Sequence, residues 1–165
     1  MKNQEESINK LINIVPSNHP ALMIAHFSDE ENILLQELYK KSIKEDIEYQ
    51  INFLGDDIEL IKQKYQNPLI KLIKFNLERA KYMIQGKIYD FVFVTAKIDD
   101  INNFLQKVHH IIKNSGNIII ILDKEQNTDI WLKLLEDNYF VATSIISDLI
   151  DNTHIIISKK MHGWK

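Results

Sequence analysis

The sequence predicts an α/β fold in which helices cover both faces of a doubly wound, mostly parallel sheet. Short apolar runs of strand length alternate along the chain with longer segments of helical periodicity. Residues 117–122, NIIIIL, show no polar alternation, which is typical of a central parallel strand with both faces buried. Only residues 148–152, DLIDN, separate the last two apolar runs. Because these are too few for a helical crossover, the last two strands should form an antiparallel hairpin.

Bulk composition indicates a single domain over residues 1–165. Hydrophobic residues make up 45% of the chain and charged residues 26%, and a chain of this length buries about 70% of its unfolded surface. The absence of cysteine excludes disulfides and thiolate metal sites, and a net charge of −3 gives no general attraction to nucleic acid or to an anionic membrane. The chain begins without the apolar core of a signal peptide and has no run of membrane-spanning length, so we expect a cytoplasmic protein.

The chain opens with an amphipathic accessory helix within residues 1–16. Its apolar positions recur at helical spacing until Pro16 ends the pattern. Residues 21–27, ALMIAHF, form a run long enough only for a buried strand. Ser28, followed three residues later by Glu31, has the pattern of a capping box and predicts that the next helix starts there. The buried face of that helix should carry Leu34, Leu35, Leu38 and Tyr39.

A second strand and a shorter helix follow. Residues 48–54, EYQINFL, alternate apolar and polar positions with the period of a strand. Asp56 and Asp57 come directly before the apolar positions of the helix, where an aspartate is most often an N-cap. The apolar positions of this helix are Ile58, Ile61 and Tyr65.

Residues 67–86 allow two interpretations. An apolar stripe of helical spacing fits one long helix that begins near Pro68 and ends at Gly86. The alternative is a strand over residues 69–75 followed by a short helix over residues 77–85. We favour the strand, because parallel neighbours in a sheet need a crossover between them.

In the second half of the chain, strand-length apolar runs and helical periodicity alternate more clearly. Residues 89–94, YDFVFV, are expected to form a strand buried on both faces. Helical periodicity over residues 98–112 predicts a helix of about four turns. We expect Gly116 to end this helix, at a position that needs a left-handed backbone.

The central strand and the closing elements follow from the same patterns. The central strand should be fully buried on both faces, with Ile119 and Ile121 on one face and Ile118 and Ile120 on the other. Residues 140–147 and 153–160, FVATSIIS and THIIISKK, should form the closing hairpin. The helix before this hairpin should direct inward Ile130, Trp131, Leu134 and Leu135.

In this arrangement the chain resembles the class I S-adenosylmethionine-dependent methyltransferases, most closely over residues 86–160. YDFVFV resembles their fourth-strand motif, in which an aromatic residue and an Asp lead an apolar run. IIKNSGNIIIIL resembles the segment before their fifth strand, with Asn114, Ser115 and Gly116 in the turn, and WLKLLEDNYF resembles the helix before their sixth strand. The resemblance implies a Rossmann-like, methyltransferase-like sheet with the strand order 3-2-1-4-5-7-6.

The resemblance also implies positions for a cofactor site. The family follows its first strand with a glycine-rich turn, because glycine lets the backbone approach the ligand closely. Here that turn is AHFSDEE, without glycine, and His26 and Phe27 carry side chains into the space of the methionine group. The acid that grips the ribose hydroxyls at the end of strand two is matched by Asp56 or Asp57. Asn76 replaces the adenine-site acid after strand three.

These departures shape the functional expectation. Thr95 begins the segment after strand four, where amino-methylating members carry an Asn-Pro-Pro-Tyr type motif that this sequence lacks, so no substrate class is indicated. The divergent, glycine-poor loop predicts weak or absent binding of S-adenosylmethionine in a crevice narrowed by His26 and Phe27. No histidine pair has a spacing typical of a metal site, so no metal is expected.

We favour a methyltransferase-like protein of doubtful catalytic activity, and three uses of the fold stay open. The first is a methyltransferase with a divergent cofactor loop. The second is a non-catalytic relative that uses the fold to bind an unidentified protein partner. The third is a binder of another small ligand in the same crevice, at the carboxyl ends of the strands.

Overall fold

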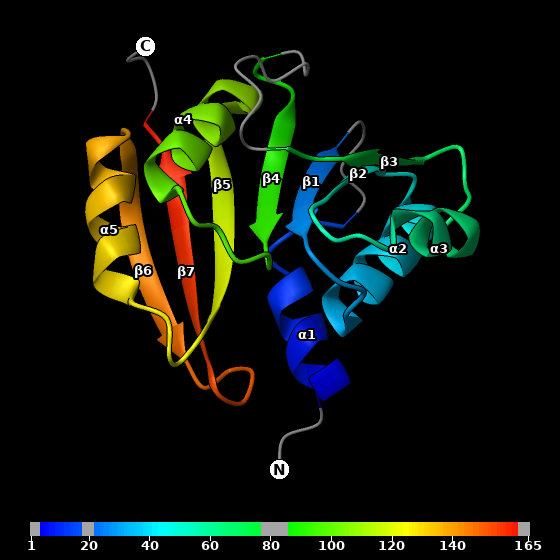
Figure 1. The fold of residues 1–165 in the computed structure, drawn as a ribbon, viewed down its shortest axis with the longest axis horizontal. Coiled ribbons are helices and arrows are strands. Elements are labelled where there is room, and N and C mark those ends of the chain that lie inside the picture. Colours follow the sequence, from blue (N-terminus) through cyan, green and yellow to red (C-terminus); the bar gives the residue numbers. More distant parts are fainter. Residues whose placement is uncertain (1–3, 18–21, 77–85, 162–165) are drawn as a thin grey trace.

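The computed structural model describes residues 4–17, 22–76 and 86–161, which form one sheet with helices packed on it (Figure 1). The helices are α1 (Gln4–Ile12), α2 (Ile33–Glu45), α3 (Ile58–Lys64), α4 (Ile101–Ile111) and α5 (Thr128–Asp137). The strands are β1 (Met23–Ser28), β2 (Glu48–Phe53), β3 (Ile70–Lys74), β4 (Tyr89–Val94), β5 (Ile112–Asp123), β6 (Phe140–Ser147) and β7 (Thr153–Lys160). In these described ranges no helix is long and apolar enough to cross a membrane.

The sheet has seven strands in the order β3-β2-β1-β4-β5-β7-β6. Strands β1 to β5 pair in parallel, and β7 runs antiparallel to both of its neighbours. The predicted fold class and strand order are therefore confirmed. β3 decides the interpretation of residues 67–86 in favour of a strand, because it pairs in parallel with β2. The helix expected over residues 77–85 lies outside the described residues.

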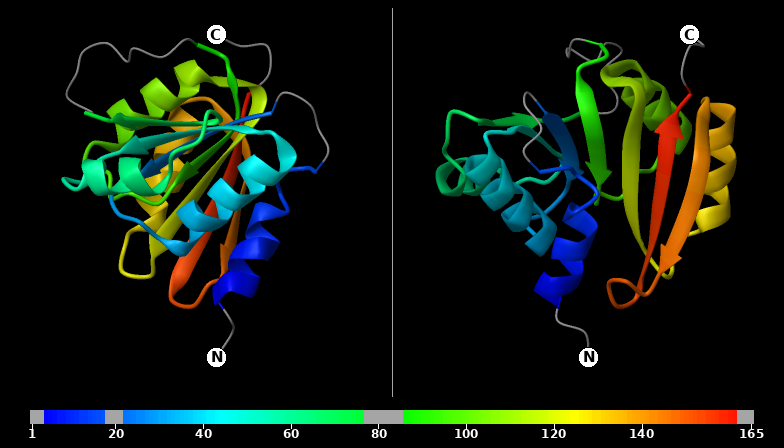
Figure 2. Two further views of the ribbon diagram at one scale, coloured as in Figure 1. Left: turned by 90° about the vertical axis from the view of Figure 1, so that its right-hand side faces the viewer. Right: turned by 180° about the vertical axis from the view of Figure 1, so that it is seen from behind.

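Two helical layers enclose the sheet, with α1, α2 and α3 on one face and α4 and α5 on the other (Figures 1 and 2). Each face has its own apolar cluster. The cluster under α1, α2 and α3 includes Leu11, Ile24, Leu35, Leu38, Tyr49, Phe53 and Phe93. The cluster under α4 and α5 includes Phe27, Val92, Phe104, Leu105, Ile120, Trp131 and Leu135. Along the central strands, alternate residues belong to alternate clusters. These strands therefore have no polar face.

The central strand β5 is buried as predicted at three of four positions. Ile118, Ile119 and Ile120 are each 0% exposed. Full burial of Ile121 was a wrong prediction, since this side chain is only partly buried. The reason is local: Ile121 borders a cavity at the carboxyl ends of the strands.

The predicted capping box at Ser28 is wrong. Ser28 is the last residue of β1 and pairs with Phe53 of β2, so the helix cannot begin there. Helix α2 starts at Ile33, and its N-cap is Asn32, whose side-chain oxygen accepts a hydrogen bond from the Leu35 amide at 2.8 Å. Asn32 directly precedes the apolar run of the helix, which is the position that a capping side chain requires.

Gly116 does not end a helix, contrary to the prediction. Helix α4 ends at Ile111, and the residue with a left-handed backbone is Ser115, with φ of 65°. Gly116 lies within β5, where a Cβ atom would come within 2.7 Å of Ile112 Cγ1 and 2.9 Å of the Lys113 carbonyl oxygen. The glycine is needed there because the chain approaches itself closely at an irregularity in the strand.

Helix α5 departs from the prediction at Ile130. Trp131 and Leu135 are buried and Leu134 is partly buried, but Ile130 is 47% exposed. Successive helical residues are rotated by about 100°, so a stripe centred on Trp131 and Leu135 leaves Ile130 at its border.

We predict that an Ile120→Ala substitution lowers the free energy of unfolding by about 2–5 kcal/mol, because it leaves a cavity between β5 and the helices above it. Urea denaturation measures this change. The matched control is Ile130→Ala on the exposed side of α5, which should cost less than about 1 kcal/mol. Equal costs for the two variants would contradict the burial of β5.

Candidate functional site

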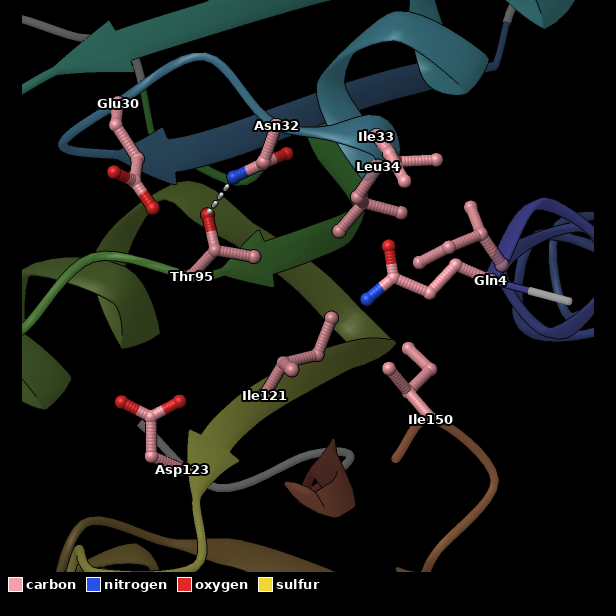
Figure 3. Close-up of a pocket in the computed structure, with 10 residues that line it drawn as sticks. Gln4, Glu30, Asn32, Ile33, Leu34, Thr95, Ile121, Asp123 and Ile150 are labelled. Carbon is pink, nitrogen blue, oxygen red and sulfur yellow. Dashed lines mark hydrogen bonds between the residues drawn. The ribbon is translucent and has the colours of Figure 1, made fainter. Parts of the chain in front are cut away.

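The candidate site lies where the connections of the sheet diverge. From β1 the chain passes through α2 to β2, and from β4 it passes through α4 to β5 on the other side, so β1 and β4 form a topological switch point. Ligands of open α/β sheets bind in the crevice at such a point. A cavity of about 320 Å³ opens there, between the carboxyl ends of the strands and the start of α1 (Figure 3). It is lined by Gln4, Ile8, Glu30, Asn32, Ile33, Leu34, Thr95, Ile121, Asp123 and Ile150.

A buried histidine on β1, His26, lies beneath the cavity and hydrogen-bonds to Thr95, which lines it. His26 on β1 is 0% exposed, and both of its ring nitrogens are hydrogen-bonded. Nδ1 lies 2.7 Å from the Tyr49 hydroxyl and Nε2 lies 2.8 Å from Thr95 Oγ1. Burial lowers the pKa of His26 to about 3 and raises the pKa of the Tyr49 hydroxyl. Both groups are therefore neutral at physiological pH.

The neighbouring hydrogen bonds show which group donates and which accepts along the series from Tyr49 to Glu30. Ser28 Oγ donates to the Glu30 carbonyl oxygen at 2.7 Å, so it accepts from Thr95 Oγ1 at 3.2 Å. Thr95 is then free to accept from Nε2 of His26, and Nδ1 accepts from the Tyr49 hydroxyl. Every donor in the series from Tyr49 to the Glu30 carbonyl thus has an acceptor, as a buried network requires.

The same network fixes the loop between β1 and α2. Asn32 Nδ2 donates to Thr95 Oγ1 at 3.3 Å and to Ser28 Oγ at 3.4 Å. The Asp29 carboxylate accepts from the Lys97 amide at 3.0 Å, which ties the loop to the segment after β4. On the opposite side the Glu31 carboxylate contacts the Lys64 ammonium at 2.7 Å. The loop is therefore held by side chains from both directions.

The loop also lies directly against the end of β2. The Leu54 amide donates to the Ser28 carbonyl at 2.9 Å. At Gly55 a Cβ atom would collide with the Asp29 carbonyl oxygen and come within 2.7 Å of Phe53 Cε2. Glycine at this position lets the two loops touch, and the contact closes the space between the ends of β1 and β2.

His26 and Phe27 do not narrow the crevice as predicted. Both side chains are buried inside β1 on opposite faces of the sheet, and neither lines the cavity. Phe27 packs edge-to-face on Phe75 and Phe104, with ring centroids 4.9 Å apart in each pair. The strand continues through Ser28, so these residues belong to the core rather than to the loop.

The structure does not bring the other predicted site residues together. Asp56 and Asp57 are exposed, and Asp57 occupies the N-cap position of α3 without a capping hydrogen bond from its side chain. Asn76 is exposed beyond β3. None of these three lines the cavity. Thr95 is the one residue of the predicted set that does, at the end of β4.

The predicted set of site residues does not include the two acids of the cavity, Glu30 and Asp123. Asp123 ends the central strand β5, and a polar residue at the carboxyl end of a buried parallel strand is a usable signal for a site. Glu30 carries no such signal, since only the course of the loop places it there. In the described part of the chain, no group of three or more His, Asp or Glu side chains could hold a metal ion.

Solved structures share this architecture. The CMeT domain of the citrinin polyketide synthase superposes with a TM-score of 0.77 at 12% identity, over 96% of this chain and 51% of that one. Haemonchus contortus phosphoethanolamine N-methyltransferase 2, solved with S-adenosyl-L-methionine, gives a TM-score of 0.71 at 9% identity, over 95% of this chain and 52% of that one. The chain thus spans about half the length of these two proteins.

A third neighbour is the methyltransferase solved in complex with the Trm112 methyltransferase activator of Haloferax volcanii, with a TM-score of 0.72 at 8% identity, over 96% of this chain and 91% of that one. The chain has the class I methyltransferase fold. Neither a scan against protein-family models nor a search of curated proteins finds a match. The likeness therefore concerns the methyltransferase fold, and the identities of 8–12% carry no functional residues with it.

We predict that Gly55→Ala destabilises the protein by about 1–3 kcal/mol, because the added methyl group forces the β1–α2 loop away from β2. Urea denaturation measures the loss, and amide chemical shifts of the residues from Ser28 to Asn32 report the loop displacement. Unchanged stability together with unchanged shifts would show that the loop does not contact Gly55.

We predict that the His26 ring stays neutral in the folded protein down to about pH 3. Below pH 6.5 the unfolded chain binds a proton that the folded chain does not, so stability falls as the pH decreases from 6.5 to about 3, by up to about 1.4 kcal/mol per pH unit. His109, with a pKa lowered to about 4 chiefly by burial, acts in the same direction. NMR titration of the imidazole signals tests this, and a His26 ring that titrates near pH 6.5 would contradict it.

Proposed function

We propose that this chain is a methyltransferase-like protein that binds S-adenosylmethionine weakly or not at all and holds a different small ligand in the cavity at the switch point. The observation that carries the proposal is the position of the β1–α2 loop, whose Asp29 carbonyl lies against Gly55. A ligand that reaches from the end of β1 to the end of β2 would have to displace this contact. The cavity instead extends toward β4 and β5.

The residues present do not fit the cofactor that the fold family implies. A ribose needs an acceptor at the end of β2 in the same crevice as the rest of the ligand, but Asp56 and Asp57 lie outside the cavity. The loop after Ser28 is also held in place, since its carbonyls and side chains already hydrogen-bond with β2, the segment after β4 and α2. No methyl-transfer step is therefore assigned to residues of this chain.

A second candidate is a module that binds a protein partner. The edge strand β6 exposes Ile145 and Ile146, which are 42% and 37% accessible. Their partners in β7, Ile156 and Ile155, belong to the clusters on opposite faces of the sheet, so β6 is apolar on both of its sides. Figure 2 shows β6 and β7 from behind, with none of the described helices in front of them. A Haloferax neighbour was solved with an activator protein, which makes partner binding a reasonable use of the fold.

The deciding experiment is calorimetric titration of the purified protein with S-adenosylmethionine and with S-adenosylhomocysteine. We expect no saturable binding of either compound below about 1 mM, equivalent to a binding free energy weaker than about 4 kcal/mol. S-adenosylhomocysteine serves as the matched comparison, because it lacks the sulfonium charge. Micromolar binding of either compound would overturn the proposal, and its weakening by the double variant Asp56→Asn, Asp57→Asn would favour an enzyme.

A further inference from the structure

The cavity at the switch point has a one-sided charge. Its two charged lining residues, Glu30 and Asp123, are both acids, and no Lys, Arg or His is among the described residues that line it. Both acids are exposed, and neither forms an ion pair with another described residue. The nearest lysine in sequence, Lys124, is paired with Asp148 at 2.5 Å instead.

The remaining wall of the cavity is largely apolar. Figure 3 shows Glu30 and Asp123 on one side with Thr95 between them, and Leu34, Ile150 and the Gln4 side chain on the other side. The aliphatic residues among those that line the cavity are Ile8, Ile33, Leu34, Ile121 and Ile150. A ligand that matches both sides has an apolar body and a polar head at the acids, and a volume of about 320 Å³ is at the small end of ligand sites, which span about 300–1,000 Å³.

The partial positive charges of two helix N-termini at the cavity oppose the negative charges of the two acids but are smaller. Helices α1 and α2 begin at Gln4 and Ile33, and each N-terminus is equivalent to about half a positive charge. Glu5 and Glu6 in the first turn of α1 offset its contribution, and the Asn32 side chain occupies an amide of α2. Among the described residues, the two full negative charges of Glu30 and Asp123 therefore decide the sign of the field, which favours a cation.

We propose that this cavity binds a small organic cation, an amine or ammonium with an apolar body, whose charged head is held by Glu30 and Asp123. The ligand class rests on the proposed function, since it names what occupies the crevice in place of S-adenosylmethionine. Thr95 and Asn32 supply the neutral polar contacts near the head, and the aliphatic wall covers the body. An anion of the same size is disfavoured by the two acids.

The test compares 2-phenylethylamine with 3-phenylpropanoate, which have similar bodies and opposite charges. Binding is followed by amide chemical shifts of Leu34, Thr95 and Ile121 at low salt. We expect the amine to bind with a dissociation constant in the millimolar range and the anion to bind about ten-fold more weakly or worse. Glu30→Gln and Asp123→Asn should each weaken amine binding by up to about five-fold, and the double variant by about ten-fold or more.

Glu136→Gln is the matched control, because it removes the same charge from an exposed position on α5 that does not line the cavity. It should leave amine binding unchanged, and all variants alter exposed side chains, so circular dichroism should show the wild-type fold. Equal binding of amine and anion, no shifts at the cavity amides, or amine binding that survives the double variant would each overturn the inference. The titration with S-adenosylmethionine is a separate measurement, so the proposed function and the ligand class can fail independently.

Discussion

The hydrogen-bonded series through His26 is the constraint on which the site depends. A histidine buried inside a central strand is destabilising unless both ring nitrogens find partners, and here Tyr49 and Thr95 provide them. Thr95 then links the ring to Ser28 and Asn32, and so to the start of α2. A polar group in the core of β1 thus determines the course of the loop that follows the strand.

The chain therefore shares the fold of the class I methyltransferases, but its β1–α2 loop differs from theirs. In the class I methyltransferases that the chain resembles, a glycine-rich turn leaves backbone amides open to the cofactor. In this chain, side chains of the β1–α2 loop bind other parts of the protein instead. The one glycine nearby, Gly55, brings two loops into contact and does not make room for a ligand. The sheet and its helices depend on the two apolar clusters, and none of residues 29–32 of the β1–α2 loop belongs to either cluster.

Much of the fold was predictable because apolar runs and connection lengths indicate the strands and their directions, and the resemblance to the class I methyltransferases implied the strand order. The strand β3 needed the chain-level argument, since its local pattern also fits a helix. The errors came from contacts that a single sequence does not display. Ser28 imitates a capping residue but is held in β1 by its pairing with β2, and Gly116 is required by the approach of Ile112 and Lys113. Of the candidate site, the prediction named only Thr95. Asp123 had a usable signal at the carboxyl end of β5, whereas Glu30 reaches the cavity only through the course of its loop.

The most direct measurement is amide hydrogen exchange at Leu35 and Lys97, whose amides are bound by Asn32 and Asp29 of the β1–α2 loop. We predict that both amides are protected in the free protein, and that their exchange is unchanged by millimolar S-adenosylmethionine, because the loop is already fixed. Protection that is absent in the free protein, or that changes when the compound is added, would show that the loop opens to admit it, and would contradict the closed crevice described above.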